Sequence, residues 1–351
     1  MSAVAYRVER WTPLTRLATV AVVIVLIALA LGPAYLSHGL IDRLPALFVY
    51  VILAAMWNAL AGYGGLVSVG QQVFFGMGAY FTIRLADAGI DPFLAMGVAA
   101  IGVGIVAYPL SFMMLRLKGG EFAIGMWVLA ELVHLLVNLD HLINGETGTS
   151  LIALNAYATV VRRDGIYWAS FAAMVVLLGV LFVLLRTRFG AAIQAIRDNE
   201  DAAGAVGVEV MATKRVIFVL AALGAGAAGA LWLAGAITFQ PKTHFSVQWT
   251  AYMIFMVLVG GIGTFEGAIL GAVLFFLVET WFGAMGVWYL VGLGAAALLF
   301  ALLLPRGLWG AIESRWGIRL LPVGYRLTLL GGANEAPAAT PTPAAAPEEV
   351  P

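Results

Sequence analysis

Long apolar stretches, separated by short polar segments, follow one another along most of the chain. About 20 apolar residues suffice for an α-helix to cross the hydrocarbon core of a bilayer. The chain lacks the long apolar/polar alternation that a membrane β-barrel needs. The pattern therefore predicts an all-α polytopic membrane protein with about ten transmembrane helices. We place them at residues 17–36, 45–62, 66–86, 92–115, 121–139, 166–185, 215–237, 249–263, 266–283 and 287–304.

Glycines interrupt this pattern in residues 62–80 and again in residues 249–283. Small residues let membrane helices pack closely, but they also let a helix break and present backbone groups to a passing solute. Both interpretations are open for these glycines, Gly261 among them. We therefore expect some helices to be broken or re-entrant. Residues 249–283 are predicted to form two short helices, a re-entrant pair or one broken span.

The composition agrees with a membrane protein. Hydrophobic residues make up 62% of the chain and charged residues 11%, against about 25% charged residues in a typical soluble domain. The absence of cysteine excludes disulfides, thiolate catalysis and cysteine metal sites, and four widely spaced histidines do not suggest a metal site. No basic run with interleaved aromatic residues indicates nucleic acid. We therefore expect no cofactor and no nucleic-acid partner.

The basic residues predict the orientation. With ten spans and the N-terminus inside, 14 of the 19 lysines and arginines fall in inner segments. The positive-inside rule then favours both termini in the cytoplasm. The first apolar stretch is long enough to span and no small-residue cleavage site ends it, so we interpret it as a retained helix. The five outer basic residues are Arg43, Arg84, Arg162, Arg163 and Lys242.

This topology divides the chain into a cytoplasmic N-terminus at 1–16, a transmembrane domain at 17–305 and a cytoplasmic C-terminal segment at 306–351. From about residue 331 the sequence is rich in Ala, Pro and Thr. Such a segment cannot bury enough apolar surface to fold, so we predict a disordered tail there. Residues 186–214 form the longest polar stretch between spans and are predicted to be a cytoplasmic loop.

Local signals within this loop predict a short exposed helix. Asp198 is placed to cap it, and Glu200 and Asp201 fall in its first turn, where the helix dipole favours negative charge. Gly207 stands where a left-handed residue commonly ends a helix. A helix this short is not stable alone in water. We therefore expect it to dock on a partner, which its small alanines would allow to approach closely.

The pattern Glu200-x-Ala202-Ala203-x-x-x-Gly207 resembles the EAA loop of ABC importer permeases. The wider run RTRFGAAIQAIRDNEDAAGAVGV is similar to permeases of the branched-chain amino acid (LivM-type) family. The blocks GLVSVGQQVFFGMGAY and MVLVGGIGTFEGAILGAVL are similar to that family too, and all three stand in its order. The resemblance covers about residues 45–305. In that family the loop forms a coupling helix that inserts into the ATP-binding subunit. The residues that the resemblance assigns to coupling are Arg197, Asp198, Glu200, Ala202, Ala203 and Gly207.

The resemblance implies a permease subunit in the bacterial plasma (inner) membrane that moves its substrate by alternating access. Its implied partners are ABC ATP-binding subunits, a second homologous permease and a periplasmic or extracellular substrate-binding protein. The chain has no G-x-x-x-x-G-K-[ST] loop, so ATP hydrolysis is expected on a separate subunit. Residues 144–151 depart from the family pattern. The substrate is therefore left open among branched-chain amino acids, other amino acids, urea and amides.

Polar residues within the spans are candidates for the translocation pathway. Ser68, Gln71 and Gln72 could pair with neighbouring helices or with the carboxylate and ammonium of an amino acid. Glu131 lies three residues from His134 on one helix face, so the two form either a structural pair or part of the pathway lining. Asn58 is expected to form an interhelical hydrogen bond. Arg162 and Arg163, outer exceptions to the charge rule, are candidates for docking the binding protein.

Two other functions were weighed. An ion-gradient-driven secondary transporter of a small polar solute would suit the broken helices, but the chain shows no clear pair of intramembrane acids in matched halves, and the EAA-like loop would have no purpose. An intramembrane enzyme is disfavoured because neither G-x-S-x-G nor H-E-x-x-H occurs.

Overall fold

A computed structural model of the chain describes residues 6–9, 13–316, 320–321, 323 and 326–329. Helices make up nearly all of the described part, and eight of them are long and apolar enough to cross a membrane. The chain is therefore an all-α, multi-pass membrane protein. These helices are α1 (Pro13–Ala30), α3 (His38–Asn58) with its π-helical end η1 (Ala59–Tyr63), α5 (Pro92–Met114), α6 (Gly120–Asn138), α7 (Thr159–Arg186), α10 (Val210–Ala236), α13 (Phe265–Phe282) and α14 (Val287–Leu303).

Two of the ten predicted segments hold shorter helices. Helix α4 (Gln72–Asp87) has 16 residues and α12 (Val247–Gly260) has 14, below the roughly 20 that a full span needs. Helix α4 begins six residues later than predicted, because residues 64–71 are not helical. Residues 249–283 form two separate helices, α12 and α13, joined by a turn at 261–264.

Helix α7 begins seven residues before its predicted start. Arg162 and Arg163 therefore lie near the beginning of a helix and not in the long outer segment where the sequence placed them. The connection before them contains η2 (Gly145–Thr147), β2 (Thr149–Ser150) and η3 (Ile152–Ala156). Strand β2 pairs antiparallel with β3 (Thr238–Phe239), which follows α10. A short helix, α11 (Pro241–His244), comes next.

Most of the glycines that were open to two interpretations serve close packing. A Cβ on Gly78 of α4 would lie 1.9 Å from the carbonyl oxygen of Gly226 on α10, and one on Gly271 of α13 would lie 1.8 Å from that of Met256 on α12. No side chain fits at such distances, so these helices touch backbone to backbone. By contrast, Gly65, Gly261 and Gly263 have positive φ angles and lie where the helices break.

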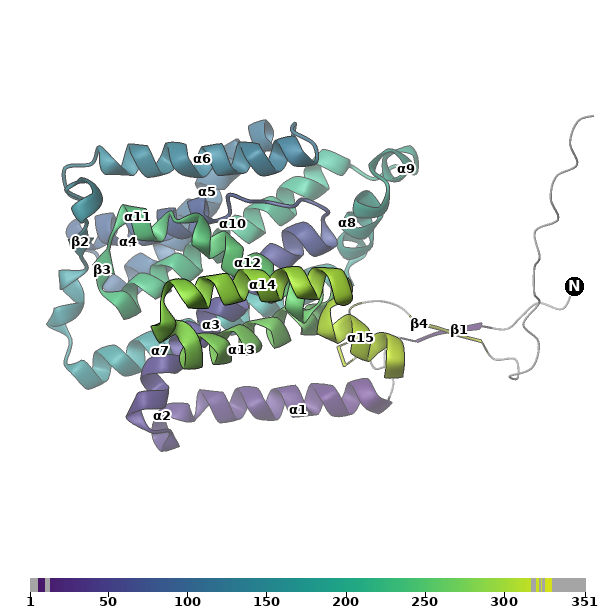
Figure 1. Cartoon of the computed structure of the whole chain (residues 1–351), viewed down its shortest axis with the longest axis horizontal. Helices are drawn as coiled ribbons and strands as arrows, with labels where there is room; N and C mark the ends of the chain where they lie inside the picture. Colours follow the sequence, from purple (N-terminus) through teal and green to yellow (C-terminus); the bar gives the residue numbers. More distant parts are fainter. Residues whose placement is uncertain (1–5, 10–12, 317–319, 322, 324–325, 330–351) are drawn as a thin grey trace, which may run out of the picture.

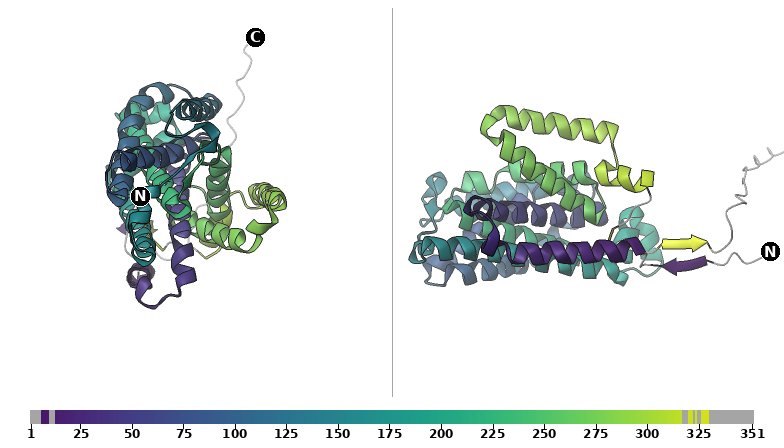
Figure 2. Two further views of the ribbon diagram at one scale, coloured as in Figure 1. Left: turned by 90° about the vertical axis from the view of Figure 1, so that its left-hand side faces the viewer. Right: turned by 90° about the horizontal axis from the view of Figure 1, so that it is seen from below.

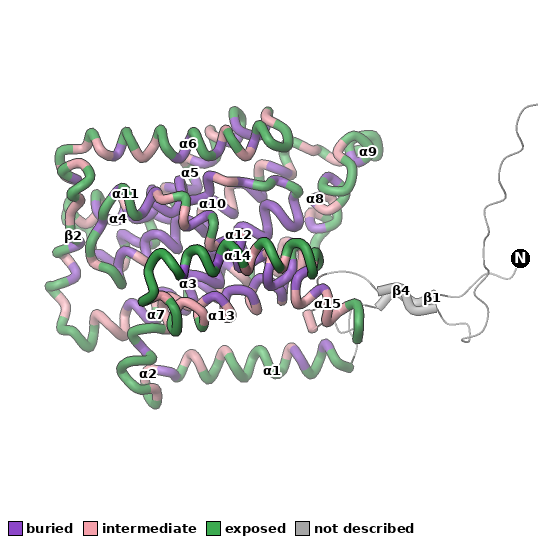
Figure 3. Tube along the Cα trace, in the orientation of Figure 1, coloured by how far each residue is buried: buried purple, intermediate pink, exposed green. Residues whose placement is uncertain are grey.

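The core is built around α3, α4, α5 and α10, whose facing sides are buried (Figure 3). Helices α1, α6 and α14 lie at the edge and are largely exposed. Tyr167 of α7 holds α1 by donating to the carbonyl oxygen of Leu29 at 2.6 Å. Seen from below, α14 stands off from the rest of the bundle, and α13 lies between it and the other helices (Figure 2). A bilayer would cover the apolar surfaces of α1 and α14.

The two ends of the bundle differ in content (Figure 1). One end, here the coupling end, carries α8 (Arg188–Asp198), α9 (Glu200–Ala205) and α15 (Gly307–Trp316). Strand β1 (Tyr6–Glu9) also pairs there with β4 (Arg326–Leu329), so both terminal segments meet. The opposite end, here the β2–β3 end, carries the two-stranded sheet, α2 (Gly32–Tyr35) and η4 (Gly283–Met285). The predicted disordered tail from residue 331 lies outside the described residues.

Candidate coupling site

The predicted cytoplasmic helix is two helices, α8 and α9, joined at one extended residue, Asn199. The oxygen Oδ1 of Asn199 accepts a hydrogen bond from the backbone N–H of Ala202 at 3.0 Å and so caps α9. The prediction that Asp198 is the cap was therefore wrong. Helix α8 continues through Asp198, and an N-cap needs the extended backbone that Asn199 has. The Asp198 carboxylate pairs with Arg197 at 2.9 Å instead.

The remaining local predictions for α9 are confirmed. Glu200 and Asp201 lie in its first turn, and Gly207 has φ +91°. Beyond α9, the N–H of Gly207 donates to the carbonyl oxygen of Gly204 at 3.0 Å, and the N–H of Val208 donates to that of Ala203 at 3.1 Å. These bonds satisfy carbonyl groups at the helix end. No atom lies within 4 Å of a Cβ added at Gly207, so a substitution there is opposed by backbone strain and not by crowding.

One side of α9 is anchored and the other is open. Ala203 is 3% exposed, so this residue of the EAA-like pattern packs α9 against the rest of the protein. Glu200 pairs at 2.6 Å with Lys214, a buried residue near the start of α10. The sequence did not indicate this ion pair, because its two partners lie 14 residues apart in the chain. The open side is formed by the exposed residues of α9 and by the residue that follows the helix. They are Asp201, Ala202, Gly204, Ala205 and Val206.

Arg197 connects α8 to the membrane domain. Its Nη1 donates to the carbonyl oxygen of Gly62, at the end of α3, at 2.9 Å. A Cβ added to Gly263, in the turn between α12 and α13, would lie 3.4 Å from the same nitrogen. Arg197 therefore lies beside two segments where membrane helices are broken. A charged donor makes this bond stronger than a neutral one would be.

Asn58 joins the same two segments, as the sequence led us to expect. Its Oδ1 accepts from the N–H of Gly263 and its Nδ2 donates to the carbonyl oxygen of Thr264, both at 2.8 Å. A turn has backbone groups that no helix satisfies, and here one side chain satisfies two of them. The contacts thus run without interruption from α9 through α8 and α3 to the turn at 261–264.

The first break in the chain, residues 64–71, holds three of the predicted pathway residues together. Ser68, Gln71 and Gln72 are all buried. The Ser68 carbonyl oxygen accepts from Trp57 Nε1 at 3.0 Å, and Gln72 Oε1 accepts from the Thr250 hydroxyl of α12. Among the described residues, both amide atoms of Gln71 lack a hydrogen-bond partner. Leaving a buried polar group unpaired costs about 1–3 kcal/mol.

The other two predicted pathway residues lie elsewhere. Gly261 is at the coupling end, where a Cβ would approach the carbonyl oxygen of Arg306 at 3.2 Å. Glu131 is on α6 with 60% of its side chain exposed and contacts His134 at 3.3 Å. The expected pair of Glu131 and His134 is therefore present, but it does not join the cluster around Gln71. Sequence spacing could place the pair on one helix face but not on a side of the bundle.

The two outer arginines are held by local contacts at the β2–β3 end. Arg162 Nη1 donates to Asn155 Oδ1 at 3.0 Å, and Arg163 Nε lies 3.2 Å from its neighbour Asp164. Both arginines are half-buried. The beginning of α7, which carries both arginines, lies at the end of the bundle opposite α9 (Figure 1).

Comparison with known proteins agrees with this geometry. The family described as "Branched-chain amino acid transport system / permease component" matches residues 39–304. The high-affinity branched-chain amino acid transport system permease protein LivM of Escherichia coli (strain K12) is 26% identical over 313 residues, which cover 81% of this chain and 73% of the relative. The probable branched-chain amino acid transport permease protein LivM of Methanocaldococcus jannaschii is 26% identical over 246 residues, 65% of this chain and 70% of the relative.

A relative named for another solute also matches. The xylose transport system permease protein XylH of Escherichia coli (strain K12) is 28% identical over 158 residues, 43% of this chain and 40% of the relative. No solved structure matches. Since the family match covers far more than half of the chain, including the coupling loop and both breaks, this protein belongs to the family of permease components of branched-chain amino acid transport systems.

Proposed function

We propose that this chain is one of two permease subunits of an ATP-driven, binding-protein-dependent importer in the bacterial plasma (inner) membrane. Its proposed substrates are branched-chain or other hydrophobic amino acids, for which its relatives LivM are named. One observation carries the proposal: a short helix with an open face, α9, is connected through Arg197 to the two places where membrane helices break. A motor outside the membrane needs such a connection to move helices inside it.

The open face of α9 is the proposed docking surface for an ATP-binding subunit. It is built of small residues around Val206, whose side chain is 81% exposed. Small side chains let a partner's groove close tightly around the helix, and an exposed valine gains free energy when it is covered. The chain has no phosphate-binding loop of its own, so hydrolysis is assigned to that separate subunit. Two ion pairs, Arg197 with Asp198 and Glu200 with Lys214, hold α9 on the side away from this docking surface.

The proposed topology has ten spans and both termini in the cytoplasm. Both terminal segments lie at the coupling end, which agrees with an even number of crossings. The two short helices, α4 and α12, cross with the help of the adjoining segments 64–71 and 261–264. Non-helical backbone is tolerated in a membrane where protein buries it, and both breaks are packed against neighbouring helices. The excess of basic residues at the coupling end favours placing it inside.

Gln71 is the proposed polar contact for the solute. Its amide offers a donor and an acceptor, which suit the carboxylate and ammonium of an amino acid. A side chain that is unpaired in this conformation gains a partner when the break opens toward the solute. Ser68 and Gln72 hold the break in shape, and Gly261 allows the second break to turn. In the proposed alternating-access cycle, closure of the ATP-binding subunits displaces α9, and Arg197 passes the displacement to both breaks.

Arg162 and Arg163 are proposed to meet the substrate-binding protein. They lie at the β2–β3 end, the external face in the proposed topology. Acidic groups on a binding protein would pair with them. Reversal of both charges should weaken uptake more at low than at high salt, because salt screens such pairs. Unchanged uptake by the double variant would contradict this assignment.

The function is tested by purifying the tagged protein gently from its own membranes. We expect a P-loop ATPase and a second hydrophobic permease to accompany it, and ATP to drive leucine uptake when the complex is placed in liposomes with its binding protein. Val206→Asp should remove the ATPase from the complex, whereas the matched variant Val206→Ala should retain it. A chain that is recovered alone and moves solute in response to an ion gradient without ATP would instead establish the secondary transporter.

A further inference from the structure

Helix α6 presents an ionisable side chain on its outward face. Glu131 is 60% exposed and lies seven residues before the end of the helix, about 10 Å inside the span at 1.5 Å per residue. Its neighbours on this face, Trp127, Val128 and Leu135, are also more than half exposed. An ionisable group within a membrane segment is costly in lipid and nearly always faces protein or water. The face of α6 formed by these four residues, here the α6 seam, is therefore unsuited to lipid.

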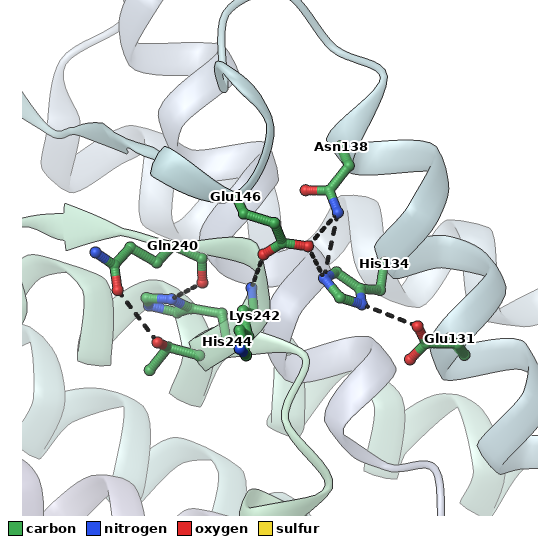
Figure 4. Close-up of polar contacts among 8 residues, drawn as sticks. Glu131, His134, Asn138, Glu146, Gln240, Lys242 and His244 are labelled. Atoms are coloured by element: carbon green, nitrogen blue, oxygen red, sulfur yellow. Dashed lines mark hydrogen bonds and ion pairs between the residues drawn. The ribbon is translucent and has the colours of Figure 1, made fainter.

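Glu131 is the inner end of a continuous polar stripe. His134 and Asn138 follow at spacings of three and four residues, which place all three on one side of the helix. At the outer end, the carboxylate of Glu146 accepts from Asn138 Nδ2 at 2.5 Å and lies 2.9 Å from His134 Nε2 (Figure 4). It also accepts from the backbone N–H of Lys242 at 3.1 Å. The stripe thus leads from an exposed loop at the β2–β3 end into the span.

The ring of His134 stands between two carboxylates. Its Nδ1 lies 3.3 Å from Glu131 and its Nε2 lies 2.9 Å from Glu146. The ring also stacks on Phe245, with centroids 5.8 Å apart. The stripe thus holds two carboxylates beside a single imidazole, and carboxylate oxygens suit the ammonium end of a zwitterion.

Other exposed faces of the bundle differ from the α6 seam. The outward face of α7 carries Val176, Val180 and Val183, and no charged residue occurs between Asp164 and Arg186. A cavity of about 410 Å³ between α12, α13 and α14 is lined by apolar and aromatic side chains. Hydrocarbon can cover both of these regions. Hydrocarbon cannot solvate the Glu131 carboxylate, so what covers the α6 seam must be polar on at least one side.

The inward side of α6 touches the first helix break. A Cβ on Gly70 would lie 1.9 Å from the carbonyl oxygen of Met126, which lies five residues before Glu131. The segment that carries Gln71 therefore packs directly on α6, and the polar stripe lies on another face of the same helix. A displacement of this break moves α6, and the stripe moves with it.

We propose that the second permease subunit covers the α6 seam and that the stripe of Glu131, His134 and Asn138 lines a water-filled outer half of the solute path between the two subunits. The proposal rests on the proposed function, because it needs a second permease. The partner helix seals against Trp127 and Val128, while water reaches Leu135 and Glu131 from the loop that holds Glu146. An entering zwitterion then meets the carboxylates of the stripe before it reaches the first break.

The absence of cysteine from the chain makes the test direct. Single variants Glu131→Cys and Leu135→Cys are compared with Val176→Cys, on the outward face of α7, in the assembled transporter in its own membrane. A membrane-impermeant cationic thiol reagent, added from outside, should modify residue 131 at least tenfold faster than residue 176. Leu135→Cys retains Glu131 and covers the case in which the first variant fails to fold. A photocrosslinker on Val128→Cys should join this chain to the second permease, identified by mass spectrometry, whereas one on Val176→Cys should not.

Equal, slow modification at residues 131, 135 and 176 would overturn the water-filled stripe, and absence of the crosslink at residue 128 would overturn the seam. Either result in a complex that still imports with ATP would leave the proposed function intact. Failure to recover any second permease would count against both. The two failures are therefore distinguishable.

Discussion

The two ends of the bundle are held together by different kinds of contact. At the coupling end, Arg197 and Asn58 bond to backbone groups of segments that lie more than 130 residues away in the chain. At the β2–β3 end, charged side chains fasten loops to nearby helix ends, as Asp140 does with Arg84 at 2.6 Å. The first arrangement joins parts of the membrane domain that lie far apart in the chain. The second fixes loops against helix ends.

The charges at the β2–β3 end are stabilised by several partners. Burial alone would raise the pKa of the Asp140 carboxyl. Hydrogen bonds from the Tyr80 hydroxyl at 2.7 Å and the Leu142 N–H at 3.0 Å, together with Arg84, lower the pKa by more than burial raises it. The pKa of Asp140 therefore lies below its ordinary value. The Tyr157 hydroxyl and two backbone N–H groups likewise lower the pKa of Asp91. These carboxylates stay ionised at neutral pH and hold their loops throughout that range.

The largest expected effect is at the end of α9. Gly207→Asp should abolish ATP-driven uptake while the protein still inserts and is purified in normal amount. An aspartate resists the positive φ, and its charge lies beside the docking face. Uptake into proteoliposomes measures the effect, and Gly89→Asp, which follows α4 and also has a positive φ with no atom within 4 Å of an added Cβ, is the matched control. Normal transport by the Gly207 variant would contradict the coupling assignment.

Arg197→Ala should reduce uptake about tenfold, the equivalent of ~1.4 kcal/mol lost from one charge-assisted hydrogen bond. The ATPase should still bind, because the open face of α9 is unchanged. The ratio of solute imported to ATP hydrolysed measures the coupling, and that ratio should fall. Arg188→Ala, which removes an exposed arginine from the same helix, should leave the ratio unchanged. An equal effect of both substitutions would mean that Arg197 acts only through its charge.

Asn58→Ala should lower both stability and uptake. It leaves the N–H of Gly263 and the carbonyl oxygen of Thr264 without their partner, at a cost of about 2 kcal/mol. The apparent melting temperature of the protein in detergent measures the loss. Asn155→Ala, which removes an exposed acceptor at the β2–β3 end, should have a much smaller effect. Equal losses would mean that the two ends contribute alike to stability.

Gln71→Met should separate function from stability. Because the amide of Gln71 has no partner in the described part of the chain, its replacement by an apolar side chain of similar size should raise stability by about 1 kcal/mol and still impair uptake. Melting temperature and uptake are measured on the same preparation. Gln72→Met, which breaks the bond with Thr250, should instead destabilise. A destabilised Gln71 variant would show that the side chain is structural.

The smallest effect concerns the opposite end and depends on pH. Tyr157→Phe removes the hydrogen bond that lowers the pKa of Asp91, so the folded-state pKa moves up toward the unfolded value of about 3.9. A lowered folded-state pKa stabilises the protein above the unfolded value, and this stability is lost as pH falls through the folded value. The melting temperature of the variant should therefore be slightly below that of the wild type at pH 7, and the difference should shrink near pH 3. Tyr35→Phe, which loses a bond to a neutral carbonyl group, should show no such convergence.

Much of the coupling site was predictable because its signals are local. The first-turn acids of α9 and the positive φ of Gly207 depend on residues a few positions apart, and both predictions are confirmed. The cap was misplaced by one residue, because Asp198 and Asn199 are equally good caps in sequence and only the extended backbone of Asn199 decides between them. Lys214 was missed because its partner Glu200 lies 14 residues away.

The sequence by itself determined that the chain spans the membrane many times as helices, which two glycine-rich regions could interrupt them, and that a short helix lies in one polar loop. Hydrophobicity and glycine content are properties of contiguous residues, so no partner is needed to read them. Only the tertiary structure decided that Ala203 faces inward, that Arg197 reaches the backbone of Gly62, and that Glu131 lies apart from Gln71. Those facts depend on how distant helices pack, and a side chain's surroundings are set by its neighbours in space and not along the chain.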